Sequence, residues 1–116
     1  MSPSSPRRRG GTKLRCRSCR PVPEEVRHAA DLLERRWVIS VIWASLEGAA
    51  RFNEFRQAVE GVPPRTLTER LRELERAGVL ERRLVPASPP YAEYLLTERG
   101  RELEPVVTAL LAWRGA

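Results

Sequence analysis

The sequence predicts an α+β fold in which several helices come first, a β-hairpin follows and a helix closes the chain. Three observations predict this order. Between Glu24 and Gly78, apolar residues recur three and four positions apart, which is the period of an amphipathic helix. Between Val79 and Leu96, two short segments alternate in part around a proline-rich turn, which is typical of a hairpin. After Thr97 the helical period returns.

The first two predicted helices cover residues 24–34 and 37–46. In the first helix, apolar side chains recur at helical spacing from Val26 to Leu33. The second is apolar nearly all round, so we expect it at the buried centre of the domain. Gly48 then supplies a stop signal.

A short helix and a longer helix follow, joined by a tight turn. The apolar face of the short helix consists of Phe52, Phe55 and Val59. Gly61 ends this helix, and Pro63 and Pro64 mark the start of the next, because proline is tolerated in the first helical turn. The apolar stripe of the longer helix consists of Leu67, Leu71 and Leu74. It covers residues 64–77 and ends at Gly78, which completes a helix-turn-helix plan.

Residues 79–85 and 91–96 are the predicted strands, and the prolines between them stiffen the tip of the hairpin. A hairpin placed after a helix-turn-helix is a wing, so the predicted architecture is a winged helix-turn-helix. Thr97 can cap the last helix, and Pro105 should kink it. The apolar face of that helix consists of Leu103, Val106, Val107, Leu110, Leu111 and Trp113.

Positive charge is concentrated at one end of the chain. Of 21 basic residues, seven lie in residues 1–20, which contain no acid, so 14 basic residues face 15 acidic ones in residues 21–116. Rich in Pro, Ser, Gly and Arg, residues 1–20 read as a disordered tail, and residues 21–116 as one folded domain. Such a tail suits a polyanionic partner, although a purely solubilising role stays open.

Several classes of protein are disfavoured by what the sequence lacks. No run reaches the ~18–20 apolar residues of a membrane span, and no apolar segment follows the basic start as in a signal peptide. We therefore expect a cytoplasmic protein without a membrane partner. The chain has one histidine, no Gly-rich phosphate loop and no nucleophile near a base, so we expect neither an enzyme nor a cofactor or metal site.

The chain resembles the HxlR-type winged helix-turn-helix transcriptional regulators over residues 24–113. The matching segments are RFNEF at 51–55, LTERLREL at 67–74, GVLER at 78–82 and PPYAEYLLTERG at 89–100, together with Trp37 and Trp113. The resemblance implies a bacterial homodimer that binds double-stranded DNA and dimerises through its flanking N- and C-terminal helices.

The departures from the family pattern lie at three places. Pro63 stands where members commonly have a small or polar cap, and residues 34–36 (Glu-Arg-Arg) stand where glycines often precede the tryptophan. Many members also carry a cysteine nearer Trp37 than Cys19 is, so a family thiol role does not transfer directly to this chain.

The helix at 64–77 is the expected recognition element. If its leucines are buried, a rotation of 100° per residue places four charged residues on the opposite face: Arg65, Glu69, Arg72 and Arg76. Thr66 and Thr68 lie on its flanks. In the major groove, arginine can donate to guanine or phosphate, threonine can contact phosphate or a thymine methyl, and glutamate can accept from cytosine. An ordinary solvated helix face is the alternative.

The wing and the preceding helix supply weaker candidates for contacts with the DNA backbone. Arg82 and Arg83 lie on the strand that leads to the wing, and Ser88 lies at its tip. Adjacent residues of a strand point to opposite faces, so at most one of the two arginines should face DNA while the other pairs with an acid. Arg51 and Arg56 are further phosphate candidates.

The predicted dimer surface combines the 24–34 helix with the apolar face of the last helix. Its expected contacts are Val107, Leu110, Leu111 and Trp113. A dimer would place two recognition helices about one DNA turn apart on a pseudo-palindromic site. The alternative from another class is a winged helix that binds protein instead of DNA, and salt-dependent DNA binding would separate the two.

Cys16 and Cys19 form a lone C-x-x-C among arginines that favour the thiolate. Three interpretations stay open: incidental cysteines in a tail, a redox switch that responds to an oxidant, or half of a zinc site. The zinc site would need two further ligands, and His28 is the only candidate nearby in the sequence, so no metal site is assigned. A small-molecule effector also stays open, and the sequence identifies none.

Overall fold

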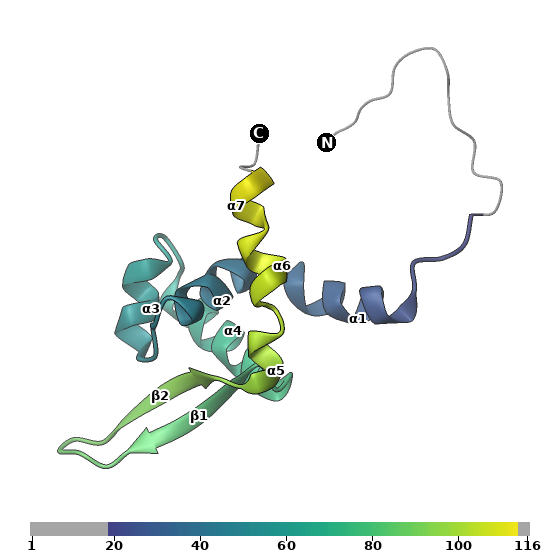
Figure 1. Ribbon diagram of the computed structural model, residues 1–116. Helices are drawn as coiled ribbons and strands as arrows, with labels where there is room; N and C mark the ends of the chain where they lie inside the picture. Colours follow the sequence, from purple (N-terminus) through teal and green to yellow (C-terminus); the bar gives the residue numbers. More distant parts are fainter. Residues whose placement is uncertain (1–18, 114–116) are drawn as a thin grey trace.

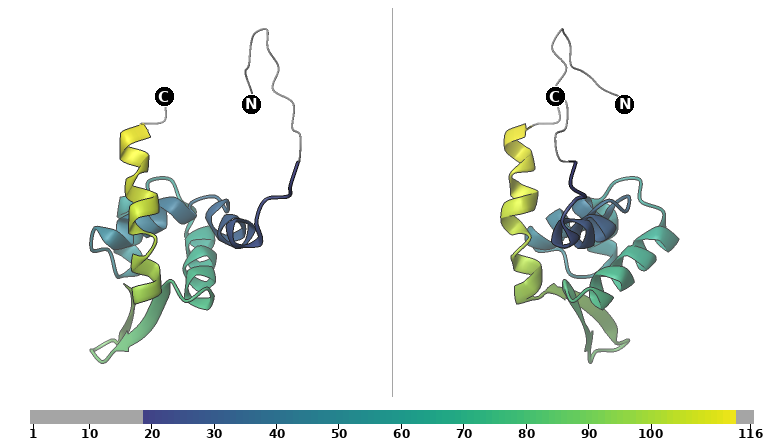
Figure 2. Two further views of the ribbon diagram at one scale, coloured as in Figure 1. Left: turned by 45° about the vertical axis from the view of Figure 1, so that its right-hand side comes forward. Right: turned by 90° about the vertical axis from the view of Figure 1, so that its right-hand side faces the viewer.

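The computed structural model describes residues 19–113. Its elements are α1 (Glu24–Leu33), α2 (Val38–Leu46), α3 (Phe52–Ala58), α4 (Pro64–Arg76), β1 (Leu80–Val85), β2 (Tyr91–Leu96), α5 (Glu98–Arg101), α6 (Glu104–Thr108) and α7 (Leu110–Trp113). Helices α2, α3 and α4 form the body, from which the β1–β2 hairpin extends at one end and α1 projects at another (Figures 1 and 2). The predicted α+β winged helix-turn-helix is confirmed.

Helix α2 lies at the centre of the core. Val38, Val41 and Ile42 are fully buried in it, as expected for so apolar a segment. It is not buried all round, however, because Ile39 on its outer side is 38% exposed. The helix begins at Val38 because Trp37 has a left-handed backbone (φ +82°), which ends the helical path on the N-terminal side.

Helices α3 and α4 form the predicted helix-turn-helix. The leucine stripe of α4 is confirmed, since Leu67, Leu71 and Leu74 are all at most 1% exposed. The helix ends with Gly78 in a left-handed conformation (φ +78°), which is the usual conformation of a glycine after a helix C-cap. The stripe holds α4 against the core and turns its other face outward.

The wing is an antiparallel pair whose register runs from Leu80 opposite Leu96 to Val85 opposite Tyr91. Only its base is anchored in the core, where Leu80 is 2% exposed. The Tyr94 backbone N–H donates to the Ala50 carbonyl (2.8 Å), which fastens the segment before α3 to the outer edge of β2. This hydrogen bond therefore fixes the position of the wing relative to the start of α3.

The predicted last helix is broken into the three short helices α5, α6 and α7. The predicted cap is confirmed, because the Thr97 hydroxyl oxygen accepts from the Gly100 N–H (2.9 Å). Pro105 falls in the first turn of α6, and its missing N–H explains why the helix of α5 stops before it. Glu102, Leu103 and Ala109 keep helical backbone angles, so the segment follows one interrupted helical path.

Candidate nucleic-acid interface

The outward face of α4 carries the charged residues that the sequence singled out. Arg65, Glu69 and Arg72 are exposed, and Thr66 and Thr68 are partly buried on the flanks. The structure thus brings the five residues together on one helix, with the buried leucines behind them. A helix face with two arginines and one glutamate can pair with the donors and acceptors of a major groove.

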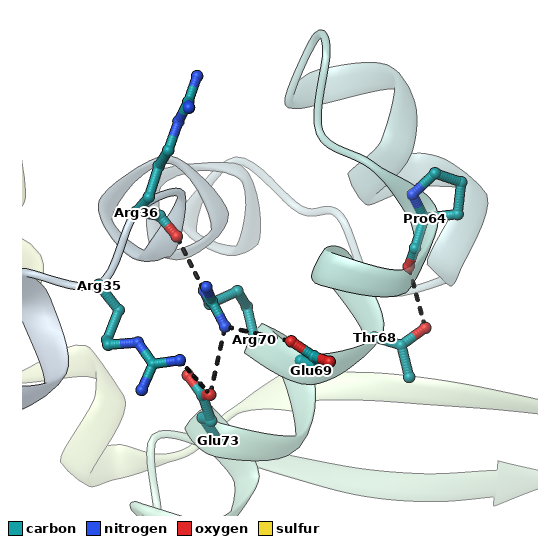
Figure 3. A network of polar contacts seen from close by, with 7 residues as sticks. All are labelled: Arg35, Arg36, Pro64, Thr68, Glu69, Arg70 and Glu73. Carbon is teal, nitrogen blue, oxygen red and sulfur yellow. Dashed lines mark hydrogen bonds and ion pairs between the residues drawn. The ribbon is translucent and has the colours of Figure 1, made fainter.

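Two of these side chains already have partners within the protein. The Thr68 hydroxyl donates to the Pro64 carbonyl (3.2 Å), so in this conformer its hydrogen is not directed at a phosphate (Figure 3). Glu69 lies 3.8 Å from the Arg70 guanidinium and is 56% exposed, so this ion pair is weak and solvated. The exposed arginines of this face, Arg65, Arg72 and Arg76, take part in no ion pair among the residues that the structure describes.

The wing separates its two arginines as predicted. Arg82 lies opposite Tyr94 in the register, whereas Arg83 lies opposite Glu93 on the other face of the hairpin. The Arg83 guanidinium is 3.8 Å from the Glu81 carboxylate, so Arg83 is the arginine with an acidic partner. Among residues 19–113, no ion pair involves Arg82. Ser88 is exposed in the loop between the strands.

Arg51 links the start of α3 to the wing. Its guanidinium lies 3.7 Å from the ring centre of Tyr91, the first residue of β2, in a cation–π contact that leaves the cation exposed. Arg56 is exposed in the last turn of α3, away from this contact. The two arginines predicted as phosphate candidates therefore lie at opposite ends of one short helix.

Glu54 secures the N-terminus of α3. One of its carboxylate oxygens accepts from the N–H groups of Arg51 (3.0 Å) and Ala50 (2.9 Å). These two backbone hydrogen bonds lower the pKa of Glu54, because they favour the charged form. At neutral pH the carboxylate therefore holds the start of α3 in place beside β2.

Sequence reasoning missed Arg70, a basic residue on α4 that turns inward. Its side chain is 11% exposed, its Nε donates to the Arg36 carbonyl (2.9 Å), and its Nη1 lies 3.2 Å from Glu73 (Figure 3). Its position could have signalled this, because it is three residues after Leu67 and four before Leu74, on the border of the buried stripe.

The C-terminal segment exposes apolar side chains, with one correction to the predicted surface. Val107 is 2% exposed and packs in the hydrophobic core, so it does not belong to the exposed apolar surface that was predicted. An α-helix turns its neighbours to different sides, and the adjacent Val106 is the exposed one. The exposed apolar residues of α6 and α7 are Val106 (53%), Leu110 (46%), Leu111 (62%) and Trp113 (68%).

A groove of about 340 Å³ adjoins this apolar surface. It lies between α2 and the C-terminal segment and is lined by Ile39, Trp43, Leu110 and Leu111, among others. Helix α1 is similarly open, since none of its residues is buried and Val26 is 53% exposed. Both flanking segments thus show apolar surface that the rest of the chain does not cover.

The remaining predicted features fall at the edge of the described residues. Cys16 lies outside them, as does most of the basic tail, whereas Cys19 is exposed and disulfide-bonded. Within residues 19–113 no three metal-binding side chains cluster, and no helix has the length and apolarity to cross a membrane.

The fold and the exposed face of α4 define the winged helix-turn-helix class of proteins. The model of the HxlR-like helix-turn-helix family matches residues 32–116, and the chain belongs to this family. It is 39% identical over 85 residues to the HTH-type transcriptional regulator YvaP of Bacillus subtilis, a match that spans 73% of this chain and 79% of YvaP.

Solved structures of two regulators also resemble the chain. The redox regulator HypR in its oxidized form has a TM-score of 0.72 and 38% identity, over 77% of this chain and 92% of HypR. The reduced form of the transcriptional regulator YodB from B. subtilis has a TM-score of 0.70 and 32% identity, over 80% of this chain and 91% of YodB.

Proposed function

We propose that this protein is a dimeric transcriptional regulator that places α4 in the major groove of a promoter site with two half-sites. The observation that carries the proposal is that α4 is amphipathic. Its leucines are buried, while Arg65, Glu69 and Arg72 are exposed together on the opposite face. Membership in a family of helix-turn-helix regulators supports the same function.

The proposed contacts divide into base readers and backbone contacts. Arg65 and Arg72 donate to guanine or phosphate, and Glu69 accepts from cytosine. Thr66 and Thr68 flank them, with the Thr68 methyl suited to a thymine methyl because its hydroxyl is engaged within the helix. The proposed backbone contacts are Arg51, Arg56, Arg82, Arg83 and Ser88, with Arg82 favoured over the paired Arg83. The tail of residues 1–20 would add affinity that is independent of sequence.

A mobility shift tests the proposal, with DNA from upstream of the protein's own gene and a random duplex of equal length. Preference for the upstream DNA, with affinity falling as salt rises, supports a DNA-binding regulator. Equal affinity for both duplexes, or no binding, would favour the protein-interaction alternative. Footprinting of the shifted DNA then defines the operator used in the experiments below.

Replacing Arg65 or Arg72 by alanine should weaken operator binding while the fold and assembly stay intact, because both side chains are exposed. A lost base contact should cost about 1–3 kcal/mol and relax one operator position, whereas a lost phosphate contact should weaken all sequences alike. Titrations on operator and single-base variants distinguish the two. Glu75→Ala on the same helix is the control, and wild-type affinity in both arginine variants would remove this face from the interface.

A redox response is a second proposal, favoured by the likeness to the redox regulator HypR and by the two cysteines. Oxidation would join two thiols in a disulfide as two electrons and two protons pass to the oxidant. Diamide should therefore change operator affinity of the reduced wild-type protein, and Cys16→Ser or Cys19→Ser should abolish the change. If mass spectrometry shows both thiols oxidized while affinity is unaltered, the pair is not a sensor.

A further inference from the structure

The turn between α1 and α2 is fastened to the recognition helix by side chains from both. From α4, Arg70 Nε donates to the Arg36 carbonyl of the turn (2.9 Å). From the turn, Arg35 Nη2 reaches the Glu73 carboxylate of α4 (3.1 Å), and the same Glu73 oxygen lies 3.2 Å from Arg70 Nη1. Figure 3 shows the three charged side chains converging on one point between the two elements.

The two α4 side chains of this ion-pair network are largely shielded from water, so solvent screens their interactions less than those of a surface ion pair. The side chains of Arg70 and Glu73 are 11% and 19% exposed, while Arg35 is 51% exposed. A single carboxylate therefore holds two guanidinium groups together across the junction. Removing its charge leaves two neighbouring cations that repel each other, with one of them largely withdrawn from water.

The turn itself needs such support. Trp37, which follows Arg36, has φ +82°, a conformation that side chains other than glycine adopt at a cost. The Arg36 guanidinium stacks over the Trp37 ring at 4.5 Å, and the Trp37 ring adjoins Gly61. Contacts from outside the turn therefore help to hold a backbone that its own local preferences do not favour.

We propose that Arg35, Arg70 and Glu73 form a brace that sets the angle between the recognition helix α4 and the projecting helix α1. The three act as positioning residues, since their charges are directed at one another across the junction. Base contacts depend closely on the orientation of a helix in the groove, whereas flexible side chains reach phosphates from many orientations. The brace therefore supports the preference for operator over random DNA. This inference rests on the proposed function.

Glu73→Gln separates a positioning role from a purely electrostatic one, because the two roles predict opposite changes in operator affinity. Removing a negative charge near DNA should strengthen binding if only charge matters. Loss of the brace should instead weaken operator binding by about threefold to tenfold and leave random-DNA binding unchanged or stronger. The exposed Glu75 on the same helix provides the matched control: Glu75→Gln should not weaken operator binding. Stronger or unchanged operator binding by Glu73→Gln would overturn the brace.

A double-mutant cycle tests whether Arg35 of the turn and Glu73 of α4 affect DNA binding through their mutual contact. Arg35→Met keeps the apolar stem of a half-exposed side chain and should lower operator affinity, and combining it with Glu73→Gln should cost less than the sum of the two. Additive losses would mean that the residues act separately. Because Arg35 is half exposed, this variant also tests the brace if Glu73→Gln fails to fold.

Hydrogen exchange gives a readout that does not depend on DNA. In both variants the amides of Arg35 and Val38, which donate to Leu32 and Arg35 carbonyls within the turn, should exchange faster than in wild type. Unchanged exchange would refute the brace. If wild-type protein does not distinguish operator from random DNA, the proposed function fails, and this measurement still decides whether the brace exists.

Discussion

Replacing Leu110 and Leu111 together by glutamate should yield a folded monomer that no longer binds an operator with two half-sites. Both side chains are substantially exposed, at 46% and 62%, so the protomer core is not disturbed. In a dimer, however, the two carboxylates would be buried in an apolar interface without partners, which is costly. Because the two half-sites would then be bound independently, operator affinity should fall by about 10²–10⁴-fold.

Sedimentation at micromolar concentration and operator titration measure the two effects. The matched control is the double replacement by methionine, which keeps the apolar surface and should stay dimeric. Circular dichroism should show the same helix content in both variants. A glutamate variant that still sediments as a dimer would move the interface away from α7. Deleting the whole segment would be less informative, because Val107 belongs to the protomer core.

Gly100→Ala should destabilise the protein, although alanine normally favours a helix over glycine by about 1 kcal/mol. Gly100 lies in α5, where an added Cβ would clash with the Val79 carbonyl oxygen and stand 2.9 Å from Leu96 Cδ1. The same junction is tied by the Thr97 N–H, which donates to the Val79 carbonyl (3.0 Å). Because the neighbouring oxygen belongs to the backbone, it cannot simply turn away. The cost should be about 1–3 kcal/mol or more.

Denaturant unfolding measures this cost as a change in the free energy of unfolding. Gly48 provides the contrast, because it has φ +107° but no atom within 4 Å of a built Cβ. Gly48→Asn should therefore cost less than Gly100→Ala, since asparagine tolerates positive φ better than other side chains and meets no obstacle there. Wild-type stability in Gly100→Ala would mean that α5 does not pack on the α4–β1 junction as described.

The elements that the sequence predicted best are those governed by local rules. Leu67, Leu71 and Leu74 fall on one face of any helix that contains them, and Gly78 ends that helix through its own backbone freedom. The hairpin was predicted equally well, because the alternation of apolar residues and the prolines of its turn are local features. The residues of the outward α4 face followed directly, since burying one side of a helix determines which residues remain on the other.

Errors arose where a residue's role depends on a distant part of the chain. Val107 reads as one more apolar residue of an exposed face, yet α6 packs against α2 and buries it. Arg70 was not among the predicted site residues, yet it donates to a carbonyl 34 residues earlier. In both cases the helical spacing was clear from the sequence, but the sequence did not reveal which element packs against the residue.

By itself, the sequence determined the class of fold, the order of its elements and the face of α4 that is turned outward. These follow from hydrophobic period, capping and turn residues, which act over a few positions. Only the tertiary structure decided which apolar residues of the C-terminal segment stay open, why Gly100 has no room for a methyl group, and how Arg35 and Glu73 join the turn to the recognition helix. Those facts depend on contacts between segments far apart in the chain, and no local pattern encodes such distances.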